Sequence, residues 1–511
     1  MSNETQECRK LSVAMIVRDA EHCLAATLDC VRNLADEIVV LDTGSQDSTI
    51  RIARQKATKV ASAAWTDDFS AARNAVLELA TGDWVLWLDA GETLSPETAE
   101  ALRTFIDREA DAATAYYLLV RTPPQGANIA GEQVARIRLH PRVPRLAFHG
   151  RVRESLQPSL SQLGLKTAGL AYTLSRTAQE HSPIVRKQRA ERNLHLVRLA
   201  IKDEGASPGL LNCAGEASQA IGDSIASARF HREALEQGEA GSNDMLEAYY
   251  GLLTALEGEP NCRDAQLQLC MKGLEHFPID AQLLCAIGGY LQSKEQLELA
   301  SRAYQLSAEH GQLSLEIWHL EGMQEIATNC YAHTLQLLGR EAEAVELLDQ
   351  RLAANPQSAR LRRQLLELHV RGARADAALA VVNNIPRNVP NREALRSAVR
   401  GACLAADGDW GAAKPYLDTA FKSGCREPLA LDWLTQTLFA LGKPDDAAIV
   451  LEEWSRVDPL SPALRSARDL LLQEPEGAER RTLRVDAKVC GGVAMPRLGS
   501  LPSMPSSTCG K

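Results

Sequence analysis

The fold is decided by a stretch that reads Glu37-Ile38-Val39-Val40-Leu41-Asp42-Thr43-Gly44-Ser45-Gln46-Asp47-Ser48-Thr49. An apolar run that ends in an acid, a glycine and hydroxyl residues is typical of a buried strand leading into a helix. Further apolar runs lie at Leu11–Val17 and Trp84–Leu88, and Lys59–Ser62 is a third strand with a weaker pattern. Helical spacing separates the runs, at Glu21–Asn33, from about Ser48, at Ser70–Ala80 and at Pro96–Arg108. Strands that alternate with single helices predict βαβ units and a mostly parallel sheet.

The pattern changes after Ala110. Strand-like pieces follow at Ala115–Val120, at Val134–Leu139 and near Ala168–Leu174, and a helix is expected over Pro183–Lys202. Gly, Ser and Pro cluster at 205–209, which is typical of a linker between domains. We therefore expect an α/β domain over residues 11–204, preceded by a polar segment at 1–10.

Residues 205–473 read as helices that repeat. Turn glycines occur at Gly222, Gly258, Gly339, Gly372, Gly408 and Gly442, and the last four are 33, 36 and 34 residues apart. Small residues follow the turns, as in Ala344, Ala378, Ala413 and Ala447. A period near 34 with two helices per unit predicts a tetratricopeptide-like solenoid, and the alternative is a non-repetitive helical bundle. Residues 311–330 break the register as an insertion or a longer helix, and composition predicts a disordered tail over 474–511.

Composition excludes several classes of protein. The 511 residues carry a formal net charge of −10, so the chain presents no basic footprint for nucleic acid. The twelve cysteines are scattered without a Cys-x-x-Cys pair, which favours free thiols and a reducing compartment. No apolar run is long enough for a transmembrane helix, and the N-terminus lacks an export signal. We expect a cytoplasmic protein.

Ligands of open parallel sheets bind at the carboxyl ends of the strands, so two loops are candidates for binding. In the first loop, Asp42 can accept hydrogen bonds from a base or a ribose, and Gly44 and Ser45 let the backbone approach a ligand. Asp47 or Ser48 could instead cap the next helix.

The second loop contains Asp89 and Glu92, which follow the strand Trp84–Leu88. Two carboxylates at this place could hold Mg²⁺ or Mn²⁺ against a diphosphate. Arg73, near the start of a helix between the loops, could bind a phosphate or the acids of the neighbouring loops. The alternative for Arg73 is an ordinary surface ion pair.

A basic stripe lies between residues 136 and 153. Its members are Arg136, Arg138, His140, Arg142, Arg145, His149, Arg151 and Arg153. In an acidic protein such a stripe suits a diphosphate or an anionic acceptor, with His149, Arg151 and Arg153 as possible contacts. The alternative is an exposed strand face paired with surface acids. Glu154 is a candidate general base for the acceptor nucleophile, or else a structural ion-pair partner.

Four ordered motifs over about 80 residues carry a resemblance to a known family. They read Val13-Ala14-Met15-Ile16-Val17-Arg18-Asp19, then Asp36 to Thr49 with the loop quoted above, then Asp68-Phe69-Ser70-Ala71-Ala72-Arg73-Asn74, then Gly82-Asp83-Trp84-Val85-Leu86-Trp87-Leu88-Asp89-Ala90-Gly91-Glu92. Together they resemble glycosyltransferase family 2, and within it the bacterial branch of peptide S-glycosyltransferases and lipopolysaccharide-core glucosyltransferases, often fused to tetratricopeptide repeats.

The resemblance implies a GT-A fold, which is Rossmann-like, and inverting hexosyl transfer from a nucleotide-sugar, commonly a UDP-sugar, assisted by a divalent metal. By position, Asp42 would meet the nucleotide, Arg73 would lie near the donor, and Asp89 would be the first acid of the Asp-x-Asp motif. The repeats would hold a protein, peptide or glycan acceptor, or a protein partner.

The sequence departs from the pattern of this branch at three places. Gly91 stands where the second acid is expected, so Glu92 would have to substitute as the metal ligand. Arg18-Asp19-Ala20 replaces a usual Lys-Asn-Glu, and Arg153-Glu154 replaces a His-Glu pair. These departures motivate an alternative function, namely a catalytically degenerate scaffold whose repeats bind a protein partner.

Overall fold

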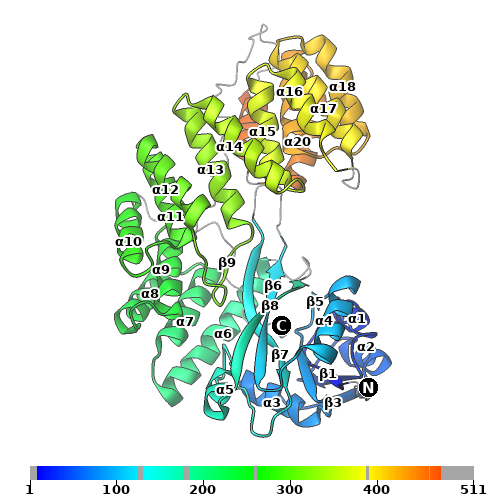
Figure 1. The fold of residues 1–511 in the computed structure, drawn as a ribbon, viewed down its shortest axis with the longest axis vertical. Coiled ribbons are helices and arrows are strands. Elements are labelled where there is room, and N and C mark those ends of the chain that lie inside the picture. The colour runs from blue at the N-terminus through cyan, green and yellow to red at the C-terminus, as the bar shows by residue number, and fades with distance from the viewer. Residues whose placement is uncertain are drawn as a thin grey trace, which may run out of the picture.

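The computed structural model describes residues 9–123, 130–176, 183–257, 262–386, 391–459 and 461–473. An α/β domain is followed by an array of helices, which confirms the predicted fold class (Figure 1). Most of the expected polar segment 1–10, the expected tail from 474 and the turn at Gly258 lie outside the described residues.

The α/β domain contains the strands and helices that the periodicity predicts, to within a few residues, and two short elements besides, β5 and α5. Its elements are β1 Leu11–Val17, α1 Leu24–Cys30, β2 Glu37–Asp42, α2 Thr49–Lys56, β3 Lys59–Ser62, α3 Phe69–Leu79, β4 Trp84–Trp87, β5 Glu92–Thr93, α4 Pro96–Arg108, β6 Thr114–Thr122, β7 Glu132–Pro141, α5 Gln157–Leu163, β8 Lys166–Arg176 and α6 Pro183–Glu204.

One sheet runs through the domain, in the order β3-β2-β1-β4-β7-β6-β8-β5. Strands β1 to β4 pair in parallel, as the alternation of strands and helices predicts. Strand β7 then pairs antiparallel with β4, and Leu86 lies opposite Leu139. The carboxyl end of β4 therefore meets β7 beside Arg138, where the acidic loop begins.

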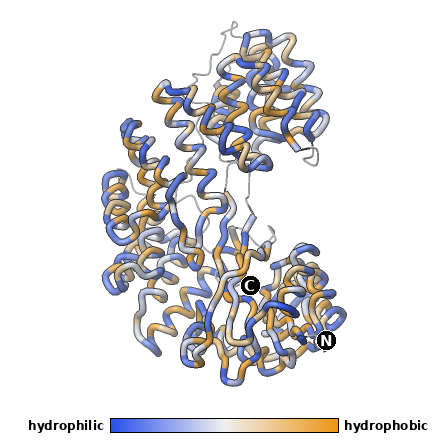
Figure 2. The backbone as a smooth tube through the Cα atoms, viewed as in Figure 1, coloured by the Kyte–Doolittle hydropathy of each residue, from blue (hydrophilic) through white to orange (hydrophobic). Residues whose placement is uncertain are grey.

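Both faces of the sheet are covered. Alternate residues of β1 point to opposite sides, so Val13 and Met15 belong to one core and Ala14 and Ile16 to another. All four side chains are fully buried or nearly so. Figure 2 shows the same arrangement, with apolar segments inside the domain and polar segments outside. A sheet buried on both faces presents its loops, rather than its faces, to ligands.

The second part is a solenoid of antiparallel helices. They are α7 Pro208–Ile221, α8 Ser224–Gln237, α9 Asn243–Leu256, α10 Arg263–His276, α11 Ala281–Ser293, α12 Leu297–His310, α13 Met323–Leu337, α14 Glu341–Ala354, α15 Ala359–Arg371, α16 Ala375–Asn383, α17 Arg392–Ala406, α18 Trp410–Lys422, α19 Pro428–Ala440, α20 Pro444–Val457 and α21 Pro462–Gln473.

Most of the predicted turn glycines have the geometry of a tight turn, whereas Gly372 has a φ of −85°. Gly339, Gly408 and Gly442 adopt positive φ, a backbone conformation that glycine tolerates best. The small residues predicted at the helix crossings are fully buried: Ala344, Ala378, Ala413 and Ala447 all have 0% exposure. The period near 34 therefore corresponds to stacked helix pairs.

Residues 311–322 form an insertion between α12 and α13 rather than a longer helix. The insertion contains strand β9, His319–Leu320, which pairs antiparallel with β7 of the α/β domain. The backbone N–H of Ala135 donates to the carbonyl of Leu315 at 2.6 Å, and that of Glu321 donates to the carbonyl of Gly131 at 2.7 Å. The repeat array thus adds a strand to the sheet.

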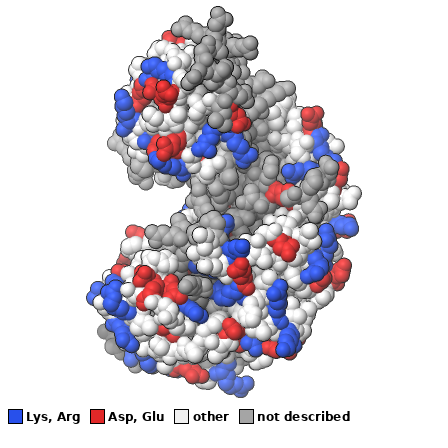
Figure 3. Space-filling model, turned by 180° about the vertical axis from the view of Figure 1, so that it is seen from behind, with Lys and Arg blue, Asp and Glu red and all other residues white. Residues whose placement is uncertain are grey.

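The two parts also share a core. Cys213 and Ala214 of α7 belong to the same apolar cluster as Val197 of α6 and Trp87 of β4. The boundary predicted near residue 205 falls in the short connection between α6 and α7. The division of the chain into two domains at this place stays a prediction. Figure 3 shows a deep notch between the α/β domain and the last repeats.

Two general features complete the fold. The nine cysteines of the described residues are all free thiols, and eight of them are buried. A search of the described helices finds none with the length and apolarity that crossing a bilayer requires.

Candidate active site

The first predicted loop is held together by its own acid. Asp42 ends β2 and is only 1% exposed. Its carboxylate accepts hydrogen bonds from the backbone N–H groups of Gly44 at 3.0 Å and Ser45 at 3.1 Å. Gly44 adopts a φ of 105°, which a side chain would make unfavourable. The geometry fixes the loop at the end of β2.

Asp47 has the capping role that the sequence left open. Its carboxylate accepts a hydrogen bond from the backbone N–H of Thr49 at 2.9 Å, at the start of α2, and from that of Glu21 at 3.1 Å. Asp47 is therefore used for local structure, whereas Asp42 remains the candidate for nucleotide contact.

The second loop carries two buried acids, Asp89 and Glu92, which are 1% and 0% exposed. Arg138 of β7 donates to both from a single nitrogen, at 2.7 Å to Asp89 and 2.6 Å to Glu92. Arg176, the last residue of β8, donates to Glu92 at 3.2 Å. Strands β7 and β8, which follow the loop in sequence, thus place the guanidinium groups of Arg138 and Arg176 against the two acids.

Charge and burial act in opposite directions on the two acids. Burial alone would raise the pKa of Asp89, but Arg138, followed by Arg73 and Arg176, lowers it below its usual range. For Glu92, burial outweighs Arg138 and raises the pKa above its usual value. The pKa values of the two acids are therefore set by the surrounding arginines and by burial, unlike those of free carboxylates.

Arg73 joins the acidic loop to Glu154. From the buried face of α3 it donates to Asp89 at 3.2 Å, and its Nε lies 2.6 Å from a carboxylate oxygen of Glu154. Its guanidinium carbon lies 4.3 Å from the ring centre of Trp87 and 5.1 Å from that of Phe148. Arg73 is 4% exposed, so it is not the surface ion pair that the sequence left open.

Arg73, Asp89 and Glu154 line one cavity of about 310 Å³ whose wall comes from both parts of the chain. Its lining does not include Glu92 or the predicted residues Asp42, Gly44 and Ser45. The α/β domain contributes charged residues to its lining, and so do α7, α9 and the insertion: Arg73, Asp89, Arg136, Arg138, Arg153, Glu154 and Arg176 from the domain, and Glu216, Asp244, Glu247 and Glu316 from the repeats. The sequence did not predict this contribution of the repeats, because nothing in the repeat pattern indicates contact with the domain.

The three basic residues predicted as anion contacts separate in space. Arg153 lines the cavity and pairs with Glu216 of α7 at 2.7 Å and Glu247 of α9 at 2.6 Å. His149 instead contacts the hydroxyl of Ser159 at 2.9 Å, and Arg151 pairs with Asp203 at the surface at 2.7 Å. Neither His149 nor Arg151 is in the cavity lining. Arg138 and Arg176 line the cavity instead.

The sequence contained an indication for two of the arginines that line the cavity. Arg136 and Arg138 are two residues apart in a predicted strand, so strand periodicity places them on the same side. Arg176 ends β8 without any motif around it, and no local signal could have linked it to Asp89.

The arrangement of Asp89 and Glu92 does not fit a divalent ion. The oxygens of Asp89 accept from Arg73 and Trp87 on one side and from Arg138 on the other. Those of Glu92 accept from Arg138 and Arg176, and from the backbone N–H of Asp89 at 3.1 Å. Every carboxylate oxygen faces a donor, and two arginines stand where a cation would. Among the described residues, no group of three potential metal ligands occurs.

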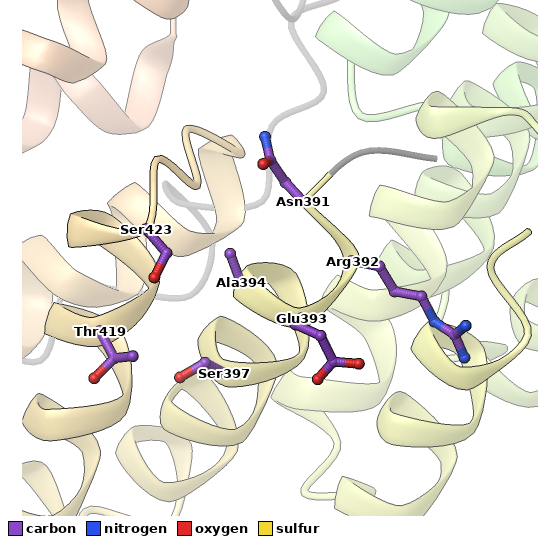
Figure 4. Close-up of a pocket in the computed structure, with 7 residues that line it drawn as sticks. All are labelled: Asn391, Arg392, Glu393, Ala394, Ser397, Thr419 and Ser423. Atoms are coloured by element: carbon purple, nitrogen blue, oxygen red, sulfur yellow. The ribbon is translucent and has the colours of Figure 1, made fainter. Parts of the chain in front are cut away.

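A second cavity, of about 590 Å³, lies on the repeats between α17 and α18 (Figure 4). Its hydroxyl groups are used locally, since Ser397 donates to the carbonyl of Tyr416 and Thr419 to that of Pro415. The cavity shows no catalytic set of side chains. Charges of both signs are interspersed on the face shown in Figure 3, with no extended basic region among the described residues.

An α/β sheet with acids after β2 and β4, and a buried carboxylate, Glu154, linked to Asp89 through Arg73, is the arrangement that the GT-A resemblance leads us to expect. Residues 12–124 match glycosyl transferase family 2. A TPR repeat-containing protein of Synechococcus elongatus is 31% identical over 283 residues, which cover 53% of this chain and 67% of that protein. The chain therefore belongs to glycosyltransferase family 2 and carries tetratricopeptide-like repeats behind its transferase domain.

Two further relatives bear glycosyltransferase names. An uncharacterized glycosyltransferase of Rickettsia typhi is 30% identical over 22% of this chain and 38% of its own. The SPbeta prophage-derived glycosyltransferase SunS of Bacillus subtilis is 27% identical over 30% of this chain and 36% of its own. The chain spans little more than a third of the length of these two relatives.

Proposed function

We propose that the chain transfers a sugar from a nucleotide-sugar donor, most simply a UDP-sugar, to a nucleophile of a protein, peptide or glycan acceptor. Membership of glycosyltransferase family 2 supports the class of donor. The observation that carries the proposal is that Glu154 and Asp89 are linked through Arg73 in one cavity. A candidate base thus lies beside the loop that, by position, meets the donor.

The chemistry is a single displacement. An acceptor hydroxyl or thiol attacks the anomeric carbon, the bond from that carbon to the diphosphate oxygen breaks, and the nucleoside diphosphate leaves. Glu154 takes the acceptor proton, and attack from the face opposite the leaving group inverts the anomeric centre. Arg73 holds the carboxylate of Glu154 in place through its 2.6 Å contact. Asp42, held in place by the N–H groups of Gly44 and Ser45, orients the nucleotide.

The acceptor enters on the side that the repeats provide. Glu216, Asp244, Glu247 and Glu316 lie on this wall of the cavity, whereas the donor side is lined by arginines. Stacked helix pairs form extended surfaces that suit a polypeptide chain. We therefore assign the repeats to an acceptor protein or peptide, or to a protein partner that presents it.

The test is a turnover assay of the full chain with a panel of nucleotide-sugars, in parallel samples with EDTA and with Mn²⁺. We expect release of nucleoside diphosphate from at least one donor, and binding of its diphosphate by calorimetry. Asp42→Asn should weaken binding, and Asp29→Asn, which changes an exposed acid that pairs with Lys56, should not. Absence of binding and turnover with every donor in both samples would leave the degenerate scaffold as the better description.

A further inference from the structure

We propose that Arg138 and Arg176 take the place of a divalent ion in this site and bind the donor diphosphate, so that sugar transfer needs no metal. The inference rests on the proposed function, because it concerns the diphosphate of the same donor.

Formal charge supports the replacement. A divalent ion between two carboxylates brings two positive charges against two negative ones. Here the guanidinium groups of Arg138 and Arg176 bring the same two charges against Asp89 and Glu92, while the charge of Arg73 is shared between Asp89 and Glu154. Both arginines are buried, at 4% and 7% exposure, so water does not screen them strongly. Arginine also matches phosphate geometry with several N–H donors in one plane.

Arg138 has donor capacity left for a ligand. Its contacts to Asp89 and Glu92 use one terminal nitrogen. Within the described part of the chain, its Nε–H group is buried and donates to no protein atom. A buried guanidinium N–H without an acceptor is unfavourable, and Arg138 lines the cavity in which an acceptor could lie. A phosphate oxygen of the donor would satisfy this group.

Position 91, where the second acid of a metal site is expected, has a structural role in this loop. Gly91 stands where a second acid is expected, and its backbone N–H donates to the hydroxyl of Thr27 at 2.9 Å. Its φ of 90° lies in the left-handed region. Position 91 carries no carboxylate, and the carboxylate of Glu92 is paired with Arg138 and Arg176. The loop therefore has two guanidinium groups against it where a metal site would need free carboxylate ligands.

The decisive experiment uses the unmodified full chain. UDP is titrated into the protein by calorimetry after exhaustive treatment with EDTA, and again with Mn²⁺, and turnover of the preferred donor is measured in both buffers. We expect dissociation constants and rates that agree within about twofold. Loss of binding by tenfold or more in EDTA, restored by Mn²⁺, would overturn this inference and leave the proposed function intact. No binding in either buffer would overturn both.

Variants then identify the residues. Arg138→Lys keeps a charge but removes the planar set of donors, so UDP should bind at least tenfold more weakly, and Mn²⁺ should not restore it. Arg51→Lys on the exposed face of α2 is the matched control and should bind as the wild type does. The double variant G91D/R138M restores the second acid and removes a guanidinium, and its UDP binding should become dependent on Mn²⁺. UDP binding by Arg138→Lys that equals the wild type would contradict the role of Arg138.

Discussion

Glu154 lies at the centre of the proposed chemistry at the scale of single residues. Its carboxylate is 1% exposed and contacts Arg73 at 2.6 Å. Glu154→Gln keeps the size of the side chain but removes the proton acceptor, so kcat should fall by about 10²- to 10⁴-fold while the dissociation constant for UDP stays close to that of the wild type. Steady-state kinetics and calorimetry measure the two quantities. The control Glu100→Gln changes an exposed glutamate of α4, and a kcat of Glu154→Gln within tenfold of the wild type would exclude the base.

His140 gives the stability of the protein a dependence on pH. It is 1% exposed, and its Nδ1–H donates to the carbonyl of Pro141 at 3.0 Å. Burial lowers its pKa from 6.5 to about 4, so the unfolded chain binds a proton in this interval that the folded protein does not. The contribution of His140 is fully present above about pH 6.5 and falls as the pH is lowered toward 4, by about 3 kcal/mol in total.

The matched variant for this effect is His140→Gln, which cannot titrate. The free energy of unfolding is measured by urea denaturation of both proteins between pH 4 and 8. The free energy of unfolding of the wild type minus that of His140→Gln should be constant above pH 6.5 and should decrease as the pH falls below it. A difference that stays flat across the whole range would show that His140 is not held neutral by burial.

For single residues, the sequence predicted where the site residues lie better than it predicted which side chains they contact. Asp42, Asp89 and Arg73 were predicted from their places after strands and at the start of a helix, and they lie at the carboxyl edge of the sheet. His149 and Arg151 belonged to a run of basic residues, and a run does not say which way each side chain points. Arg176 pairs with an acid 84 residues away, a contact that only the register of β5 with β8 creates.

At the scale of elements, the insertion at 311–322 holds the repeats against the transferase sheet. Trp318 is 9% exposed, and its ring centre lies 5.8 Å from that of Tyr250 in α9. Trp318→Ala should destabilise the insertion by about 3 kcal/mol or more, because a large buried side chain leaves a cavity. Hydrogen exchange of residues 311–322 and urea denaturation measure the effect.

The control for this variant lies in the same insertion. Leu315 is 51% exposed, so Leu315→Ala should change the free energy of unfolding by less than about 0.5 kcal/mol. Equal effects of the two substitutions would mean that Trp318 does not anchor the insertion.

Elements with strong periodicity were predicted closely. β1, β3 and α4 begin and end at the predicted residues, because an apolar run or a Ser-Pro start marks them. β5 and β9 have two residues each, too few for any period to register. The break of the repeat register at 311–330 indicated an insertion, but its pairing with β7 depends on contacts between distant parts of the chain.

At the scale of the whole molecule, Arg153 links the transferase domain to α7 and α9. It is paired with Glu216 and Glu247, whose side chains are 17% and 5% exposed. Arg153→Met leaves two largely buried carboxylates without their cation, so the protein should lose about 3 kcal/mol of stability. Replacing the acids as well, in R153M/E216Q/E247Q, should recover most of this loss.

Urea denaturation of the single and triple variants measures this coupling. Arg229→Met, which breaks an exposed pair with Glu233, is the control and should cost less than about 0.5 kcal/mol. If the triple variant is no more stable than Arg153→Met, then the cluster is not what joins the two parts.

The central claim is that the transferase loops and the repeat insertion form one site for a nucleotide-sugar. Hydrogen-exchange mass spectrometry of the full chain, with and without a saturating donor, tests it most directly. The account predicts slower exchange at residues 42–45 and 89–92 together with residues 314–317 of the insertion. Protection confined to the repeats, or no protection at 42–45 and 89–92, would contradict it.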